Sequence, residues 1–461
     1  PSLALRIAVL AAFLTLACLA GHWIARLVTV KNPKKPFVYT ARIKRLYGIS
    51  MIVLCAFAYL AGTFGNVIVA SVWPVLLPVL LAVCGFVAYG PEKAISEVYF
   101  QSARRKLLLQ QGLIRIGITG SYGKTSVKHI LGTILAEKYP VLITPQSFNT
   151  PMGVARTIRE RLLPSHQVFV AEMGARHVGD IREMCHLVKP TIGILTSVGP
   201  QHLETFKSME RVTKTKYELI AALPEDGQSF FVDDHAICRQ LYEQTIKPKT
   251  LVSLEPGDAD VWCENGKVTP DGSSFDLCFQ GGERLQCQTL LLGEHNILNI
   301  LLAAAVAYRL GLTKAQILRG IRRIEPVKSR MELMKNTNSY TIINDGFNSN
   351  PVSARAALSI LRQFPSRRII VTPGMVELGA DEATYNREFG RAIAQAADIA
   401  ILIGKKRVQP ILDGLREAGF PAESIHQVSS LKESTAILRR LATKDDTVLY
   451  ENDLPDHYQE S

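Results

Sequence analysis

A glycine-rich stretch at residues 117–128, GITGSYGKTSVK, has the residue types that bind phosphate groups. The glycines allow backbone N–H groups to turn toward an anion, Lys124 adds a positive charge, and Thr125 offers a hydroxyl oxygen to Mg²⁺. An apolar run typical of a strand precedes the stretch and a helical pattern follows it, which favours a nucleotide-binding loop over a solvated turn. The loop residues predicted to contact the nucleotide are Gly120, Ser121, Gly123, Lys124, Thr125 and Ser126.

Three polar residues farther along the chain have side chains suited to a catalytic site. Glu172 ends the apolar run VFVAE and His202 follows the run GILTSVGPQ, so both are expected at the carboxyl ends of strands. We interpret both as candidate metal ligands, with a solvated glutamate and a structural histidine as the alternatives. Lys216, in KTKYE, is the third candidate; its alternative is a solvated lysine on a helix face, and Lys214 lies close by.

Two asparagines follow Gly293 at helical spacing. Asn296 and Asn299 are three positions apart and therefore share one face of a helix. Capping of the helix N-terminus is one interpretation, and contact with a ligand is the other.

The elements that must position these residues alternate between apolar strands and helical patterns from residue 111 onward. This alternation predicts α/β architecture. A boundary falls near IEPVKSRMEL, and the strands YTIIND, RIIVTPG, IAILIGK and TVLYEND predict a Rossmann-like domain after it. We therefore expect a central phosphate-loop domain over 111–325 and a C-terminal α/β domain over 326–461.

The first ninety residues have a different composition. Residues 1–91 contain no Asp or Glu but eight Lys and Arg, so they carry most of the net charge of +12. This distribution argues against a nucleic-acid partner and for a lipid bilayer. Apolar stretches at 5–28, 47–65 and 67–90 each approach the length of a membrane-spanning helix.

The basic loop between the first two stretches, KNPKKPFVYTARIKR, predicts a cytoplasmic location for that loop. We expect three transmembrane helices over 1–91, a connector over 92–110, and a multi-pass protein of the cell membrane with its catalytic domains on the cytoplasmic side. A cleaved signal peptide is the alternative for the first stretch.

Several motifs together resemble the Mur ligase family, the ATP-dependent amide-forming enzymes of peptidoglycan assembly. After the loop TGSYGKT, the family's order continues with SFNTPMGVARTI, VFVAEMGARHVGDI and KPTIGILTSVGPQHLETFKSMERVTKTKYEL. LGEHNILNILLAAAVAYRLGL, NDGFNSNP and GMVELG follow. The forms EMGA and NSNP are most similar to the MurF branch, which adds D-Ala-D-Ala to a nucleotide-linked muramoyl tripeptide.

The resemblance implies a role for each matching residue, with ATP and Mg²⁺ as cofactors. Lys124, Lys216 and His202 would be catalytic, and Lys216 would be carbamylated, so that it joins Thr125, Glu172 and His202 as a metal ligand. Asn296 and Asn299 would lie against the adenine, and Arg330 and Asp345 would contact ATP. The residues implied to contact the substrates are Asn149, Thr150, Asn348 and Asn350.

The chain also departs from the family pattern. Predicted membrane helices stand where MurF-type enzymes have a domain for the UDP-sugar, and YENDLPD (450–456) replaces a basic K-G-S-R-like motif. We therefore expect a membrane-anchored amide ligase that joins an amino acid or dipeptide to a cell-wall precursor, which the departures suggest is lipid-linked. The alternatives are a ligase for another envelope or γ-linked poly-amino-acid polymer, an inactive nucleotide-binding scaffold and, least in keeping with three spans, a transport ATPase.

Overall fold

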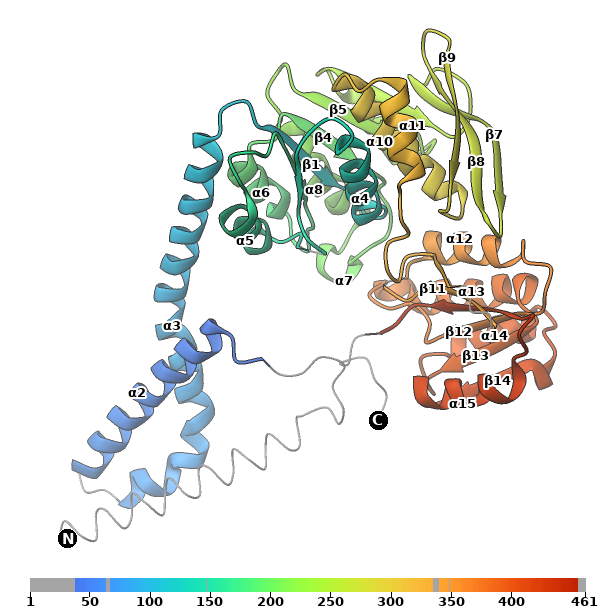
Figure 1. Ribbon diagram of the computed structural model, residues 1–461. Helices are drawn as coiled ribbons and strands as arrows, with labels where there is room; N and C mark the ends of the chain where they lie inside the picture. The colour runs from blue at the N-terminus through green and yellow to red at the C-terminus, as the bar shows by residue number, and fades with distance from the viewer. Residues whose placement is uncertain (1–37, 64–66, 147, 335–339, 348, 455–461) are drawn as a thin grey trace. The chain divides into compact units, whose positions relative to one another are not determined.

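A computed structural model describes residues 38–63, 67–146, 148–334, 340–347 and 349–454 (Figure 1). The chain divides into two compact units, of which the first ends at Gln101 and the second covers Ser102–Leu454. The first transmembrane prediction, over 5–28, lies outside the described residues.

Two helices make up the described part of the first unit. They are α2 (Ala41–Thr63) and α3 (Val67–Leu109), and α3 continues into the second unit. Arg45 Nε donates to Glu92 Oε1 at 2.6 Å, and Arg45 Nη2 donates to Glu92 Oε2 at 3.1 Å. This two-point ion pair fastens the start of α2 to the middle of α3.

The prediction of a multi-pass protein of the cell membrane is wrong. Within the described residues, a single helical stretch, Val79–Leu109, is long and apolar enough to cross a membrane, and such a stretch is weak evidence by itself. The second predicted span, over 47–65, falls largely on α2, and the described residues of α2 contain no stretch that is long and apolar enough to cross a membrane.

The second unit begins with a nine-stranded sheet in the order β2-β3-β1-β4-β5-β6-β7-β8-β9. The first six strands along the chain pair in parallel, and β7, β8 and β9 form an antiparallel meander at one edge. The bounds are β1 Ile114–Thr119, β2 Val141–Ile143, β3 Val168–Glu172, β4 Ile192–Leu195, β5 Gln228–Val232, β6 Lys249–Ser253, β7 Val261–Thr269, β8 Gly272–Phe279 and β9 Glu283–Thr289.

Helices flank this sheet as two groups that pack among themselves, one of α4, α10 and α11 and one of α5, α6 and α8. The bounds are α4 Lys124–Leu135, α5 Pro151–Arg161, α6 Asp180–Val188, α7 Leu203–Phe206, α8 Met209–Ala221, α9 Ile237–Gln244, α10 Glu294–Arg309 and α11 Lys314–Arg322. Strand β3 is buried along its whole length, as expected for a parallel strand with helices on both faces.

A second, six-stranded sheet has the order β10-β11-β15-β12-β13-β14 (Figure 1). All neighbours are parallel except β10 and β11, so this domain has the predicted open α/β architecture. The bounds are β10 Glu332–Met334, β11 Thr341–Asp345, α12 Pro351–Leu361, β12 Arg368–Thr372, η1 Gly379–Asp381, α13 Glu382–Ala396, β13 Ile399–Ile403, α14 Gln409–Glu417, η2 Ala422–Ser424, β14 Ile425–Val428, α15 Leu431–Leu441 and β15 Thr447–Glu451.

Local sequence explains where the helices that border the site begin. Thr150 precedes Pro151, and its hydroxyl accepts the backbone N–H of Gly153 at the start of α5. Asn350 precedes Pro351, and its side chain accepts the N–H groups of Val352 and Ser353 at the start of α12. Proline at the first helical position behind a polar cap fixes both helix starts.

Candidate functional site

A cavity of about 680 Å³ collects most of the residues that the sequence predicted for the site. It is bordered by the phosphate loop, the carboxyl ends of β3, β4 and β5, helices α8 and α10, and residues 330–356. Of the predicted residues, the lining includes Ser121, Gly123, Lys124, Thr125, Ser126, Asn149, Thr150, Glu172, His202, Lys216, Asn296, Asn299, Arg330, Asp345 and Asn350. Gly120 lies in the same loop without lining the cavity, and Asn348 lies outside the described residues.

The phosphate loop joins the central strand β1 to the first turn of α4. Gly120 and Gly123 have φ angles of +148° and +79°, which residues with a side chain rarely adopt. A Cβ atom on Gly120 would lie 2.9 Å from the carbonyl oxygen of Ser197 and still closer to the hydroxyl of Thr196. The loop is therefore pressed against the residues that follow β4, and glycine is required there.

Lys124 folds back over the loop. Its Nζ donates to the carbonyl oxygens of Gly120 at 2.7 Å and Ser121 at 2.8 Å. Burial lowers the pKa of Lys124 to about 8, although Glu172 acts in the opposite direction. The Lys124 ammonium is poorly solvated and has only carbonyl oxygens as partners. A bound anion would therefore stabilise its positive charge.

Glu172, at the end of β3, is the centre of a buried polar cluster. Its Oε1 accepts from Thr125 Oγ1 at 3.0 Å and from Asn149 Nδ2 at 3.1 Å, and its Oε2 accepts from Lys128 Nζ at 2.9 Å. Burial by itself would raise the pKa of Glu172, but Lys128 and Lys124 lower it overall. Glu172 is therefore ionised, and by accepting the Thr125 hydroxyl proton it orients that hydroxyl.

His202 has a partner in the C-terminal domain. Its Nδ1 lies 2.5 Å from Glu377 Oε2, and both residues have left-handed backbone conformations, with φ of 53° and 64°. If Nδ1 carries the proton, it donates to Glu377 and leaves the Nε2 lone pair for another ligand. Backbone strain at two residues in contact is typical of functional sites.

Lys216 and Lys214 differ sharply in burial. Lys216 is 1% exposed and lines the cavity, whereas Lys214, on the same helix α8, is exposed. Desolvation, reinforced by Lys124, lowers the pKa of Lys216 well below its ordinary value. This shift favours the neutral amine, which is the form that reacts with carbon dioxide.

Asn296 and Asn299 lie on one face of α10, buried and lining the cavity. Asn296 Nδ2 donates to the carbonyl oxygen of Leu292 at 2.8 Å, and Asn299 Nδ2 contacts Asn296 Oδ1 at 3.4 Å. Asn296 thus supports the turn before its helix as well as facing the cavity. Neighbouring His295 is neutral, because burial lowers its pKa to about 4.

Arg330 joins the linker between the two sheets to the phosphate loop. Its Nη2 donates to Thr125 Oγ1 at 3.2 Å, and its guanidinium lies 4.2 Å from the ring centre of Phe347. Asp345, at the end of β11, accepts the backbone N–H of Met331 at 3.1 Å. The Thr125 hydroxyl therefore forms hydrogen bonds with both Glu172 and Arg330.

The oxygen donors at Thr125 and Glu172 are of the kind that Mg²⁺ prefers. The described residues contain no group of three or more His, Cys, Asp and Glu side chains suited to a metal ion. Thr125 and Lys216 are not among those residue types, so this absence does not test the predicted ligand set of Thr125, Glu172, His202 and Lys216, which stays a prediction.

Sequence reasoning missed Lys128, which is fully buried and pairs with Glu172. Its position one helical turn after Lys124 in GKTSVK could have revealed it, because residues at i and i+4 share a helix face. Glu377 was missed as a partner of His202. Its contact joins residues far apart in the sequence, and no local pattern predicts such a contact.

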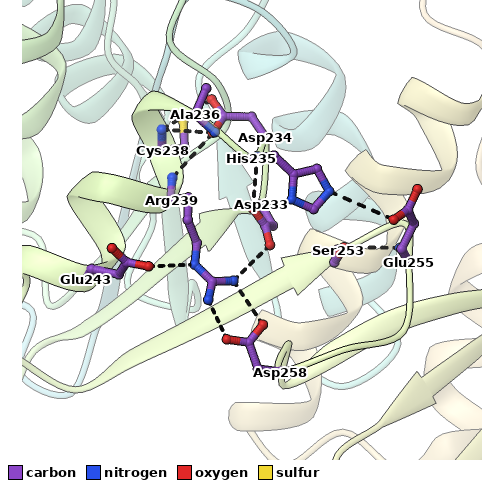
Figure 2. A network of polar contacts seen from close by, with 10 residues as sticks. All are labelled: Asp233, Asp234, His235, Ala236, Cys238, Arg239, Glu243, Ser253, Glu255 and Asp258. Carbon is purple, nitrogen blue, oxygen red and sulfur yellow. Dashed lines mark hydrogen bonds and ion pairs between the residues drawn. The ribbon is translucent and has the colours of Figure 1, made fainter.

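Asp233 and Asp234, at the end of β5, also line the cavity and belong to a polar network (Figure 2). Arg239 pairs with Asp233, Glu243 and Asp258, and the Asp234 carboxylate accepts backbone N–H groups at the start of α9. This network fastens the corner between β5 and α9 to the loop after β6. It gives the cavity a rigid acidic border.

Comparison with known proteins places this arrangement in a family. The Mur ligase middle domain matches residues 118–307, and the Mur ligase glutamate ligase domain matches residues 329–450. The UDP-N-acetylmuramoyl-tripeptide–D-alanyl-D-alanine ligase of Escherichia coli K12 is 31% identical, over 63% of this chain and 64% of its own length. The chain thus spans just under two thirds of that relative.

The enzyme of the same name from Mycobacterium leprae is 30% identical over 74% of this chain and 71% of its own length. The names of these relatives specify a UDP-linked precursor.

Solved structures share the fold. MurF from Acinetobacter baumannii matches with a TM-score of 0.70 and 24% sequence identity. The match covers 78% of this chain and 77% of the MurF chain. MurF from Thermotoga maritima, solved in complex with ADP, has a TM-score of 0.70 and 22% identity, over 78% of this chain and 80% of its own. Two family models match in order along the chain, and the match to the mycobacterial relative spans more than two thirds of that relative. This chain therefore belongs to the Mur ligase family.

Proposed function

We propose that this protein is an ATP-dependent amide ligase of the MurF type. In this reaction the γ-phosphate of ATP is transferred to an acceptor carboxylate, and the resulting acyl phosphate is attacked by an amine with release of phosphate. The observation that carries the proposal is the convergence of Lys124, Glu172 and Lys216 on one cavity. Two family models and relatives named as ligases support it.

Each group has a task that follows from its chemistry. The loop N–H groups and Lys124 bind the β- and γ-phosphates, and Glu172 holds the Thr125 hydroxyl in place. Mg²⁺, held by Thr125, Glu172, His202 and carbamylated Lys216, would neutralise phosphate charge as transfer proceeds. Arg330 adds a further cation beside Thr125, and Asn296 and Asn299 border the place of the base.

For the substrates, we propose a muramoyl peptide as acceptor and a D-alanyl-D-alanine-like dipeptide as amine. The support is the wording of the relatives' names. The polar residues Asn149, Thr150 and Asn350, with Asn348 of the same motif, are proposed to contact these substrates. The cavity is large enough to hold a nucleotide and part of a peptide.

Isotope transfer tests the reaction class. An acceptor labelled with ¹⁸O in its carboxylate should pass one ¹⁸O atom to the released phosphate, because the acyl phosphate retains a carboxylate oxygen. The assay pairs nucleotide-linked and lipid-linked acceptors with single amino acids and dipeptides, and product mass identifies both substrates. Amide formation without ¹⁸O transfer to phosphate would exclude ligation through an acyl phosphate.

A further inference from the structure

Two acidic residues lie side by side where neighbouring strands end in the C-terminal domain. Asp345 and Glu451 are register partners in the parallel pair β11 and β15. Asp345 lines the cavity, whereas Glu451 lies behind it and is fully buried. Glu451 belongs to YENDLPD, which stands where the resemblance to the family predicts a basic K-G-S-R-like motif.

The hydrogen-bond partners of Glu451 are incomplete for an ionised carboxylate. Ser349 Oγ donates to Glu451 Oε1 at 2.5 Å. Oε2 is buried and meets no donor among the described residues, and the group that faces it is the Asp345 carboxyl. An unpaired buried acceptor is costly, so an ionised Glu451 would be unstable here.

The charges around the pair favour one location for a proton. Burial raises the pKa of Asp345 to about 6, but the Met331 N–H on Oδ1 and the Arg330 guanidinium oppose this rise, so Asp345 is the easier of the two carboxyls to ionise. Among the described groups, Glu451 faces Asp345 and the neutral Ser349, and no cation acts on it. A proton on Glu451 Oε2 would convert the orphaned acceptor into a donor to Asp345.

Glu451 touches both elements through which the C-terminal domain borders the cavity. Asp345 ends β11, and Ser349 directly precedes Asn350, which caps α12. Asn350, Val352 and Ser353 at the start of that helix line the cavity. A change at Glu451 would therefore move Asp345 and the α12 cap together.

We propose that Glu451 is a positioning residue that carries a proton and holds the end of β11 and the start of α12 at the cavity. It donates to Asp345 and accepts from Ser349. The contribution of Glu451 to ATP binding rests on the proposed ligase function. The protonation of Glu451 and its effect on stability do not.

The stability consequence has a definite sign. Burial, and then the Asp345 charge, raise the pKa of Glu451 well above its usual range. The folded protein therefore binds this proton more tightly than the unfolded chain, and the free energy of unfolding falls as pH rises from the unfolded toward the folded pKa. Glu451→Gln removes this loss, since the amide can donate to Asp345 without titrating.

The test measures thermal midpoints of the full chain and Glu451→Gln between pH 5 and 9, together with infrared difference spectra at pH 7. We expect the difference in thermal midpoint, Glu451→Gln minus parent, to increase as pH rises. We also expect the parent alone to show the carbonyl band of a protonated carboxylic acid assigned to Glu451.

Asp446→Asn is the matched control. Asp446 is also buried in this domain, but Arg367 binds it and lowers its pKa. This variant should lower the midpoint by about 5 °C or more at neutral pH. If Glu451→Gln lowers the midpoint as Asp446→Asn does, or the infrared band is missing, Glu451 is ionised and the proposal is overturned.

A kinetic measurement separates positioning from simple stabilisation. The ratio of KM for ATP, parent over Glu451→Gln, should rise with pH above 7, and a titrating group of the cavity that does not interact with Glu451, such as Lys124, cancels in this ratio. A ratio that is constant with pH would show that Glu451 does not position the site. Failure of ligation with every substrate would sink the proposed function but leave the stability and infrared results interpretable.

Discussion

Lys128 Nζ lies 2.9 Å from Glu172 Oε2, and both side chains are almost completely withdrawn from solvent. The pair joins the first turns of α4 to the end of β3, beneath the phosphate loop. Since the same carboxylate holds the Thr125 hydroxyl, the ion pair determines how that hydroxyl faces the cavity. Lys128 thus supports the nucleotide site without lining the cavity.

Lys128→Met is expected to destabilise the protein by about 3–5 kcal/mol, because it leaves Glu172 buried without its hydrogen-bonded cation. Denaturant unfolding measures the loss. The double variant Lys128→Met with Glu172→Gln is the control and should lose less than the sum of the two single variants. Additive losses would show that the pair is not coupled.

Nucleotide affinity should depend on pH through Lys124. Its pKa is lowered to about 8 in the free protein, so its charge disappears as pH rises through that value. The Kd for ATP is expected to increase by up to about tenfold per pH unit above 8. Lys124→Arg keeps its charge and should show a shallower profile than the parent, whatever its absolute affinity. Equal slopes in both proteins would exclude Lys124 as the titrating group.

Lys216 should require carbon dioxide for its role. Lys216→Ala is expected to abolish ligation, and removal of bicarbonate should inhibit the parent protein reversibly. With ¹³C-bicarbonate, a carbamate signal should appear in the NMR spectrum and be missing from Lys216→Ala. Lys214→Ala, an exposed lysine on the same helix, is the control and should keep both signal and activity. Loss of the signal in the Lys214 variant would reverse the assignment.

Gly120→Ala should disrupt the phosphate loop. Its Cβ would approach the Ser197 carbonyl oxygen to 2.9 Å and would require an unfavourable φ of +148°. We expect loss of measurable ATP binding by calorimetry. Gly112→Ala separates strain from collision: Gly112 also has a positive φ, yet no atom lies within 4 Å of its added Cβ. It should cost about 1–2 kcal/mol and leave ATP binding intact.

Glu377→Ala should weaken metal binding at His202. Without the carboxylate, the imidazole loses the partner that fixes its tautomer, and such changes typically reduce metal affinity by about 10–100-fold. Manganese titration followed by electron paramagnetic resonance, with ADP present, measures the affinity. Glu388→Ala, an exposed glutamate of the same domain, should have no effect. An unchanged affinity in Glu377→Ala would assign His202 a purely structural role.

Local sequence signals were sufficient for the phosphate loop and for Glu172 at the end of β3, but His202, also expected at a strand end, lies well past the end of β4 and directly precedes α7. Glycines before a Lys-Thr pair, and apolar runs that end in a polar residue, encode strand, turn and helix over a few residues. The membrane prediction failed on the same kind of signal. Hydropathy and charge report composition, and within the described residues a single helical stretch has the length and apolarity to cross a membrane.

The sequence by itself determined the α/β architecture and the order of the motifs, because hydrophobic period and glycine placement act over short distances. Only the tertiary structure distinguished buried Lys216 from exposed Lys214, because the packing of the helix against its neighbours decides which of its faces is buried. The contacts of Lys128 with Glu172, His202 with Glu377 and Ser349 with Glu451 also required it. Each joins residues separated by tens to hundreds of positions, and burial then sets the charge that each group carries.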